Sequence, residues 1–376
     1  MGAKNEIGLE DHSKAKIELY TKYLSIYLNI IARVEFIDKI FLFDLFAGEG
    51  IYENNVKGSA LAGIECIKNH YFSNGKKCPN LDVIFNDFGQ SKIDPTIKKI
   101  DRIKSLIGKE YVPDNVNIEY KEIPYSAIIN DVIGRLNKIT RSQRALLFID
   151  PWGYKDINPV EIRNLLQNGQ TEVLLFLPIY HMYRFADKAL TDGDNFPGGK
   201  PLEKFLLTLF DDQKPNTNSN LEFIDSLSVQ FKSYLQIRYT DTFVIEREKG
   251  NFFCLFFFTN NKKGYQKMLE AKWSLDEADG KGFIINENPG QLGFFHVVET
   301  DNYLDKVKNY LRENPNTTNI ELFEFGLSNR HLPKHTKIVL DKLKSKGILE
   351  VNSLDNKPVK GYYIDNNERL VHIKLK

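Results

Sequence analysis

Two short apolar runs in this chain each end in an aspartate that is followed by a glycine-containing bend. The first is FLFDLFAGEG at residues 41–50, and the second is LLFIDPWGY at residues 146–154. A carboxylate at the end of a strand can accept hydrogen bonds from the hydroxyl or amino groups of a ligand, and glycine lets the backbone approach that ligand closely. The two runs therefore predict one site, to which Asp44 and Asp150 are brought by two adjacent strands.

Further polar residues are expected at the same edge of the predicted sheet, because open parallel sheets bind ligands beyond the carboxyl ends of their strands. The strand LDVIFND at residues 81–87 ends in Asp87, a position from which an acid can accept hydrogen bonds from a ribose. Glu122 follows the next strand and could meet the edge of a base, although a surface position is an equal alternative. Gly48 and Gly50 lack the third glycine of a dinucleotide-binding loop and the Lys-Ser/Thr pair of a phosphate-binding loop.

Apolar strands that alternate with amphipathic helices indicate an α/β fold with a mostly parallel sheet. Two later strands, at residues 242–247 and 252–260, are close enough in the chain to form an antiparallel hairpin at one edge of the sheet. These elements form a predicted first domain, residues 1–299, in which residues 184–220 are expected to be an irregular insertion. The expected earlier elements are strands that begin near residues 39, 81, 116, 145 and 172, and helices over residues 14–34, 59–71, 96–107, 125–138 and 159–166.

Residues 300–376 are predicted to form a separate small domain of three helices and a β-ribbon, which is the outline of a winged helix. From residue 303 to the end there are 14 Lys and Arg against 9 Asp and Glu. Arg330, Lys334, His335 and Lys337 gather at the start of the third helix, where cations and the helix N-terminus can both meet phosphates. Nucleic-acid binding and protein docking are equal alternatives for this domain, because lysine-rich faces are often only solvated.

The composition is that of a globular protein, with 42% hydrophobic residues among 376 and a net charge of +1, so no overall field favours nucleic acid or membranes. Cys66, Cys78 and Cys254 form no CxxC pair, which argues against a structural zinc site or a disulfide framework and suits a reducing cytosol. No histidine pair has the HExxH spacing, so no metal site is predicted. The apolar runs are shorter than the ~20 residues that span a bilayer. We therefore expect a cytoplasmic protein without membrane contact.

The residues Asp44, Phe46, Gly48 and Gly50 resemble motif I of amino-group methyltransferases, D-x-F-x-G-x-G. The segment DPWG at residues 150–153 resembles their (D/N)PP(Y/F/W) motif, with a tryptophan in place of the second proline and a glycine in place of the aromatic residue. More specifically, the chain resembles the three-Cys-motif partner family (TcmP) over roughly residues 15 to 350. Besides the helix before motif I, the pieces that carry this resemblance are FLFDLFAGEG, KGSALAGI, IFND, LLFIDPWGY, FFCLFFFTNNKKGYQKML and HTKIVLDKLKSKGIL.

This resemblance implies a Rossmann-like class I methyltransferase sheet, a C-terminal winged helix, and S-adenosyl-L-methionine as cofactor. It also implies a partner, the three-Cys-motif protein, which is similar to radical S-adenosylmethionine enzymes. The cofactor would lie over the two glycines, with Asp44 near its amino-acid end and Asp87 at its ribose, and with Phe46 and Glu122 in the same binding set. Asp150 and the Pro151 carbonyl would hold an exocyclic amine, and Trp152 or Tyr154 would stack on a flipped-out base.

Three functions are consistent with these residues and with what the resemblance implies. The first is methyl transfer to an exocyclic amino group of a nucleic-acid base, for which adenine N6 is one candidate. The second is a methyltransferase-like adaptor that binds the three-Cys-motif protein without turnover, and the third is a methyltransferase of small molecules or proteins. Each residue also has a structural alternative: the glycines could form an ordinary turn, Asp87 and Asp150 could cap helices, and Trp152 could belong to the core.

Overall fold

The computed structural model describes residues 11–52, 55–73, 78–109, 112–211, 213–247, 251–276, 280, 282–284 and 300–376. Contacts divide the chain into two compact units. The first comprises Met1–Ala271 and Lys281–Glu287, and the second comprises Lys272–Gly280 and Asn288–Lys376. The predicted boundary between residues 299 and 300 lies at the end of the range 285–299, which is outside the described residues.

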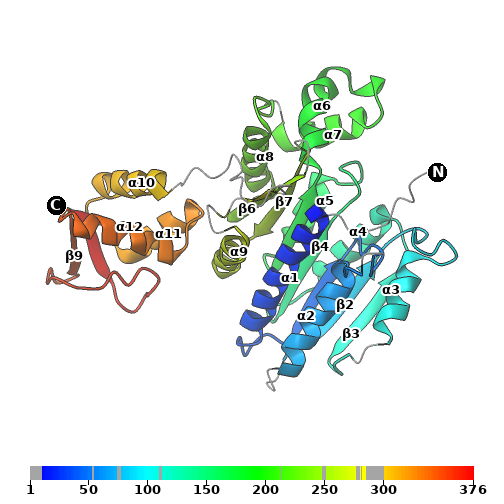
Figure 1. The fold of residues 1–376 in the computed structure, drawn as a ribbon, viewed down its shortest axis with the longest axis horizontal. Helices are drawn as coiled ribbons and strands as arrows, with labels where there is room; N and C mark the ends of the chain where they lie inside the picture. Colours follow the sequence, from blue (N-terminus) through cyan, green and yellow to red (C-terminus); the bar gives the residue numbers. More distant parts are fainter. Residues whose placement is uncertain are drawn as a thin grey trace. The chain divides into compact units, whose positions relative to one another are not determined.

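The first unit is built on an eight-stranded sheet with the strand order β3-β2-β1-β4-β5-β7-β6-β8 (Figure 1). Strands β1 to β5 are parallel, and β7 is antiparallel to both of its neighbours, β5 and β6. This confirms the predicted Rossmann-like methyltransferase fold with an antiparallel hairpin toward one edge. The short outer strand β8, which pairs with β6, was not predicted. The strands are β1 (Lys39–Asp44), β2 (Asn80–Asn86), β3 (Val116–Lys121), β4 (Gln143–Ile149), β5 (Thr171–Leu177), β6 (Tyr239–Arg247), β7 (Asn251–Thr259) and β8 (Gly282–Ile284).

Helices cover both faces of this sheet. On one face, α1 packs against α2 and α2 packs against α3, and Tyr20 of α1 stacks on Phe148 of β4. On the other face, Leu147 and Ile149 of the same strand share a core cluster with α4, α5 and α8. Neighbouring residues of a strand point to opposite faces, so the two groups of helices enclose the sheet. These helices are α1 (Asp11–Ile31), α2 (Ser59–Ser73), α3 (Lys99–Ile107), α4 (Tyr125–Leu136), α5 (Pro159–Leu166) and α8 (Asn220–Leu235). The helix α9 (Lys262–Leu275) follows β7, and its residues from Lys272 on, including Trp273, belong to the second unit.

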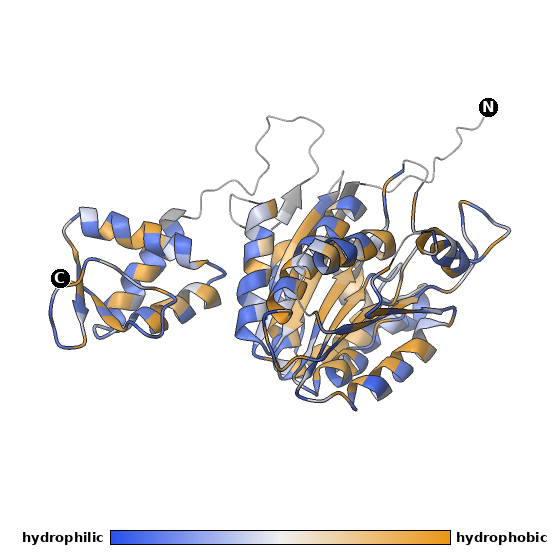
Figure 2. Ribbon diagram, turned by 90° about the horizontal axis from the view of Figure 1, so that it is seen from below, coloured by the Kyte–Doolittle hydropathy of each residue, from blue (hydrophilic) through white to orange (hydrophobic). Residues whose placement is uncertain are grey.

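The strands are apolar along most of their length because both faces are covered. Every residue of β5 is buried, and so are the last five residues of β4. Figure 2 shows the hydrophobic colour concentrated in the strands and on the inner sides of the helices of the first unit. Because the strands are buried on both faces, the residues at their carboxyl ends are held in defined positions.

Residues 184–220 are largely helical, which corrects the expectation of an irregular insertion. This region includes most of α6 (Ile179–Asp192), the short 3₁₀ helix η1 (Gly193–Asn195) and α7 (Gly199–Phe210). The segment GDNFPGGKP, residues 193–201, is rich in turn-forming residues, but the apolar residues on either side of it recur at helical spacing. Met182, Ala186 and Ala189 of α6 and Leu202, Phe205 and Leu206 of α7 are buried in the core cluster.

The second unit contains α10 (Thr300–Glu313), α11 (Asn319–Ser328) and α12 (Pro333–Ser345), followed by the antiparallel pair β9 (Leu349–Ser353) and β10 (Val371–Leu375). Its core is formed by apolar residues of all three helices together with the hairpin, including Val307, Leu322, Leu340 and Ile373. Thr318, which precedes α11, forms an isolated bridge with His372 of β10. The order of three helices and a hairpin agrees with the sequence prediction for residues 300–376.

None of the helices within the described ranges is both long enough and apolar enough to cross a membrane.

Candidate active site

Three neighbouring strands bring the predicted acids to one edge of the sheet. Asp44, the last residue of β1, pairs with Phe85 of β2 on one side and with Phe148 of β4 on the other. Asp87 directly follows β2, and Asp150 directly follows β4. All three acids therefore lie at the carboxyl ends of adjacent parallel strands, where open sheets bind their ligands. The two bends singled out in the sequence lie on neighbouring strands.

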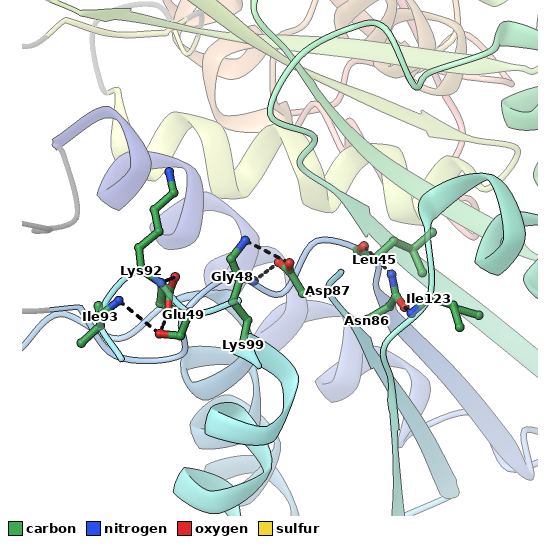
Figure 3. A network of polar contacts seen from close by, with 10 residues as sticks. Leu45, Gly48, Glu49, Asn86, Asp87, Lys92, Ile93, Lys99 and Ile123 are labelled. Atoms are coloured by element: carbon green, nitrogen blue, oxygen red, sulfur yellow. Dashed lines mark hydrogen bonds and ion pairs between the residues drawn. The ribbon is translucent and has the colours of Figure 1, made fainter. Parts of the chain in front are cut away.

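The turn after β1 requires glycine at two positions. Gly48 has φ +69° and Gly50 has φ +79°, and such angles are strained for residues that carry a Cβ. The backbone N–H of Gly48 donates to Oδ2 of Asp87 at 2.8 Å (Figure 3). The guanidinium of Arg102 donates to the backbone carbonyl of Ile51 at 2.7 Å. The turn is thus held in a defined conformation by α3 and by Asp87, the residue that follows β2.

Asp44 is fully buried behind this turn. The hydroxyl of Ser59, the first residue of α2, donates to its Oδ2 at 2.5 Å. Its Oδ1 has no hydrogen-bond partner among the described residues. Burial raises the pKa of Asp44 to about 7, against the opposing effect of the Ser59 hydrogen bond. A cationic group of a ligand placed near Oδ1 would favour the ionised carboxylate.

Asp87 and Glu49 tie the glycine turn to the segment that follows β2. Lys99 Nζ lies 3.0 Å from Oδ1 of Asp87, and both side chains are nearly buried (Figure 3). Burial raises the pKa of Asp87, and the ion pair with Lys99 opposes that rise. Glu49 accepts hydrogen bonds from the Ser91 hydroxyl at 2.6 Å and from the backbone N–H of Lys92 at 2.8 Å. A ribose at Asp87 would therefore meet a carboxylate whose orientation is already fixed.

Asp150 forms an ion pair with Lys16, a residue of α1 that the sequence did not single out. Lys16 Nζ lies 2.7 Å from Oδ2 and 2.9 Å from Oδ1 of Asp150. The same ammonium lies 4.1 Å from the centre of the Phe176 ring in β5. Lys16 is only 8% exposed, so α1 delivers a nearly buried cation to the acid that follows β4.

The two aromatic residues after Asp150 lie in different environments. Trp152 is 76% exposed, and Lys92 Nζ lies 4.1 Å from the centre of its ring. Tyr154 is 8% exposed, and its hydroxyl donates to the Gly198 carbonyl at 3.2 Å. Of the two predicted stacking residues, Trp152 is the one whose ring is accessible. A Cβ at Gly153 would meet nothing within 4 Å, so the missing aromatic of the motif leaves open space.

Three other predicted site residues make contacts of their own. Pro151 is buried directly after Asp150. Phe46 stacks on Tyr125 of α4 with ring centres 5.1 Å apart and packs against the core. Glu122 Oε1 lies 2.9 Å from Lys98 Nζ in a half-exposed ion pair. These contacts explain the positions of the Phe46 and Glu122 side chains without a ligand. A role of either residue in cofactor binding stays a prediction.

The predicted nucleic-acid residues of the second unit divide into two kinds. Lys334 and Lys337 are exposed on α12. His335 packs against Trp273 with ring centres 4.0 Å apart, and burial lowers its pKa to about 4, so the imidazole is neutral at pH 7. The Arg330 carbonyl accepts a hydrogen bond from Trp273 Nε1 at 3.0 Å. His335 is therefore an uncharged packing residue, while a role of Lys334, Lys337 and Arg330 in binding phosphates stays a prediction.

Several residues at the site were missed by the sequence prediction. In the sequence, Lys16, Ser59 and Lys99 are distinguished only as residues of predicted helices. Tyr52 lies beside the glycine turn, where a Cβ at Gly48 would be 3.0 Å from its hydroxyl. Burial, together with the nearby Asp150 charge, raises the pKa of Tyr52 to about 12. No spacing rule links these residues to the strand ends, because their positions depend on how helices and loops pack.

Another buried acid, Glu172, lies near the amino end of β5, away from the strand ends that form the candidate site. Glu172 accepts hydrogen bonds from the hydroxyls of Tyr23 and Thr259, the latter at 2.9 Å. Burial raises the pKa of Glu172 to about 7. It lines a pocket of about 90 Å³ together with Tyr27, whose hydroxyl has no partner among the described residues. Within these residues, no group of three or more His, Cys, Asp or Glu side chains is arranged to hold a metal ion.

Comparisons with known proteins find solved structures of low sequence identity. No protein-family model matches this chain, and no curated protein sequence is significantly similar. A solved structure of a putative O-methyltransferase from Klebsiella pneumoniae is 12% identical, with 67% of this chain and 92% of that chain covered and a TM-score of 0.31. A Legionella pneumophila protein of family DUF519 is 13% identical, with 70% and 92% covered and a TM-score of 0.37. Loganic acid methyltransferase with SAH is 10% identical, with 98% of both chains covered and a TM-score of 0.27.

Proposed function

We propose that this protein is an S-adenosyl-L-methionine-dependent methyltransferase that acts on an exocyclic amino group of a nucleic-acid base. The single observation that carries the proposal is the convergence of Asp44, Asp87 and Asp150 on one edge of the sheet, beside a glycine turn with two positive φ angles. The first two acids suit a nucleoside cofactor that carries an ammonium group, and the third suits an amine to be modified.

The residues at the turn fit this cofactor. Asp44 offers a buried oxygen that has no hydrogen-bond partner within the described part of the chain, which suits the ammonium of an amino acid. Asp87 is oriented by Lys99 and by the Gly48 amide, and keeps acceptor capacity for ribose hydroxyls. Gly48 and Gly50 present backbone without side chains. When bound, S-adenosyl-L-methionine supplies a methyl group attached to a positively charged sulfur.

The acceptor amine would be held by the segment after β4. The carboxylate of Asp150 and the backbone carbonyl of Pro151 are both hydrogen-bond acceptors, so together they can bind the N–H groups of an exocyclic amine. Holding these hydrogens orients the nitrogen lone pair, and such orientation can lower a barrier by several kcal/mol, on the order of 7–11 in the best intramolecular models. The residues of this chain thus act by positioning rather than by covalent chemistry.

Trp152 favours a base over other amine acceptors. Its ring is mostly exposed beside Asp150, with Lys92 and Lys99 Nζ at 4.1 Å and 5.4 Å from its centre. An exposed indole with cations at hand is a stacking platform for a base that is followed by phosphates. The second unit would add contacts to nucleic acid if its helices and hairpin act as a winged helix, with Lys334 and Lys337 near phosphates.

A second candidate is an adaptor that binds a three-Cys-motif protein without turnover. Gly153 favours it, because the (D/N)PP(Y/F/W) motif of amino-group methyltransferases has an aromatic residue at that position. Labelled methyl transfer from S-adenosyl-L-methionine to single-stranded RNA, single-stranded DNA and protein decides between the two. Label in an amino group of a base supports the proposal. Label in protein or small molecules would show that the substrate belongs to a different class. No label in any acceptor favours the adaptor.

Replacing Trp152 with alanine is expected to raise the KM for an adenine-containing single-stranded oligonucleotide by about 5- to 150-fold, because stacking of a base on an aromatic ring is worth about 1–3 kcal/mol. The affinity for S-adenosyl-L-methionine should stay unchanged. Phe36 is exposed before β1, at the opposite edge of the sheet, so Phe36→Ala is a matched control that should leave the KM unaltered. An unchanged KM in Trp152→Ala would remove the stacking role.

A further inference from the structure

The ion pair between Lys16 and Asp150 joins two elements that are far apart in the sequence. Lys16 lies in the first half of α1, and Asp150 follows β4, 134 residues later. The relative exposure of the two side chains is 10% and 21%. Removing charges from water costs free energy that their mutual attraction does not always restore, so such a pair is weak evidence for stability alone. Its position beside the expected acceptor site calls for a functional explanation.

The geometry at Asp150 shows which part of the carboxylate is engaged. Lys16 Nζ is within hydrogen-bond distance of both oxygens, at 2.7 Å and 2.9 Å. An ionised carboxylate has about four lone-pair sites, so one on each oxygen stays available. The ammonium is itself held from another side, because it lies 4.1 Å from the centre of the Phe176 ring. The Lys16 ammonium is therefore held between Phe176 of β5 and Asp150. Its contacts with both oxygens in turn restrict the orientation of the Asp150 carboxylate.

We propose that Lys16 is a positioning residue for methyl transfer: its ammonium fixes the orientation of the Asp150 carboxylate, whose remaining lone pairs then receive the acceptor amine. This inference rests on the proposed function. It gives α1 a role in orienting the catalytic carboxylate, in addition to covering the sheet. A lysine suits this part because its ammonium has three donors and no acceptor, so it cannot compete with Asp150 for the N–H groups of the substrate.

The pair itself can be tested without turnover. Lysine side chains are acylated under native conditions in the wild-type protein and in Asp150→Ala, and the modified positions are quantified by mass spectrometry. We expect the modification of Lys16 to rise several-fold in the variant, because the ammonium loses its partner. Lys39, which pairs with Asp82 at 2.6 Å at the other end of β1, is the internal control and should not change. Equal modification of Lys16 in both proteins would overturn the inference.

Kinetics then distinguish positioning from packing. Lys16→Met keeps an unbranched chain over Phe176 but removes the charge, and Lys16→Arg keeps the charge. With an adenine-containing single-stranded oligonucleotide, we expect Lys16→Met to lower kcat about tenfold or more while KM and cofactor affinity stay within about twofold, and Lys16→Arg to recover much of the loss. A fall in melting temperature without a fall in kcat, or an equal loss in both variants, would contradict a positioning role.

Two further outcomes are informative. Mass spectrometry of the wild-type protein after incubation with S-adenosyl-L-methionine should show Lys16 unmodified, and a methyl group on its Nζ would overturn the inference by making it an acceptor. If the wild-type protein transfers no methyl group to any acceptor, the proposed function fails. The acylation experiment then still decides whether Lys16 holds Asp150.

Discussion

Replacing Asp150 with alanine is expected to lower methyl transfer to an adenine-containing oligonucleotide by about 100-fold or more, which is the range that a positioned acid or base contributes. The carboxylate is the side-chain acceptor that directly precedes Pro151 and Trp152, so its loss leaves the amine without orientation. The affinity for S-adenosyl-L-methionine should change by no more than about twofold, because Asp44 and Asp87 hold that molecule. Labelled transfer and calorimetric titration measure the two effects separately.

This variant needs a control for stability, because Lys16 is left nearly buried without its partner. An unpaired buried polar group costs about 1–3 kcal/mol. The double variant Lys16→Met/Asp150→Ala removes both charges, and we expect it to regain the melting temperature but not the transfer. Asp156→Ala changes an exposed aspartate of the same loop and should leave transfer intact. Transfer by Asp150→Ala at the wild-type rate would remove Asp150 from the mechanism.

Replacing Glu172 with glutamine is expected to make the protein more stable above pH 7. Burial raises the pKa of Glu172 from 4.5 to about 7, so between these values the folded state binds the proton more tightly than the unfolded state. The free energy of unfolding therefore falls as pH rises through this window and stays low above it. The difference corresponds to about 3 kcal/mol for one group. A neutral amide in the same place avoids this loss, provided that the Tyr23 and Thr259 hydroxyls still find partners.

Urea denaturation at pH 5 and pH 8 measures this effect. The wild-type protein and Glu172→Gln should be similar at pH 5, where the carboxyl group is largely protonated, and the variant should be more stable at pH 8. Glu119 provides a control of opposite sign, because its hydrogen bonds with Arg135 lower its pKa. Glu119→Gln should therefore lose stability at pH 8. A Glu172→Gln protein that is less stable than wild type at pH 8 would show that the ionised form is the one accommodated.

The strand ends at the site could be read from the sequence because they follow local rules. β1, β2 and β4 are apolar runs of strand length that stop at an acid or just before one, and their parallel pairing follows from the helices between them. The positive φ angles of Gly48 and Gly50 are likewise a local property of the turn. These features suffice to predict that Asp44 and Asp150 lie on adjacent strands and that Asp87 lies at the same edge of the sheet.

The partners of these acids could not be read in the same way. Lys16 is one of several lysines on α1, and only the packing of this helix over β4 and β5 directs it to Asp150. Lys99 reaches Asp87 because α3 begins directly beside the glycine turn. The packing of whole helices decides which lysine lies within about 3 Å of an acid at the site. The hydrophobic periodicity of a helix predicts its buried face but does not specify this pairing.

Two other differences also have physical causes. The glycines and prolines of GDNFPGGKP favour an irregular insertion, but they occupy only the short connection around η1 and the first turn of α7. The helices on either side bury their apolar faces against the core. Trp152 and Tyr154 are two residues apart and were equal candidates for stacking on a base. The hydrogen bond of Tyr154 to the Gly198 carbonyl turns that ring inward, and the turn after Pro151 leaves Trp152 exposed.

The central claim is that a sulfonium nucleoside binds at the glycine turn, and a calorimetric titration with S-adenosyl-L-methionine tests it most directly. Gly48 and Gly169 have nearly the same positive φ, +69° and +70°, so alanine at either position costs about 1–2 kcal/mol of backbone strain. Only Gly48 lies at the proposed site, where a Cβ would also be 3.0 Å from the Tyr52 hydroxyl. We predict one binding event per chain in the wild-type protein and in Gly169→Ala, with an affinity at least about tenfold weaker in Gly48→Ala. Absence of binding by the folded wild-type protein, or equal affinity in all three, would contradict the account.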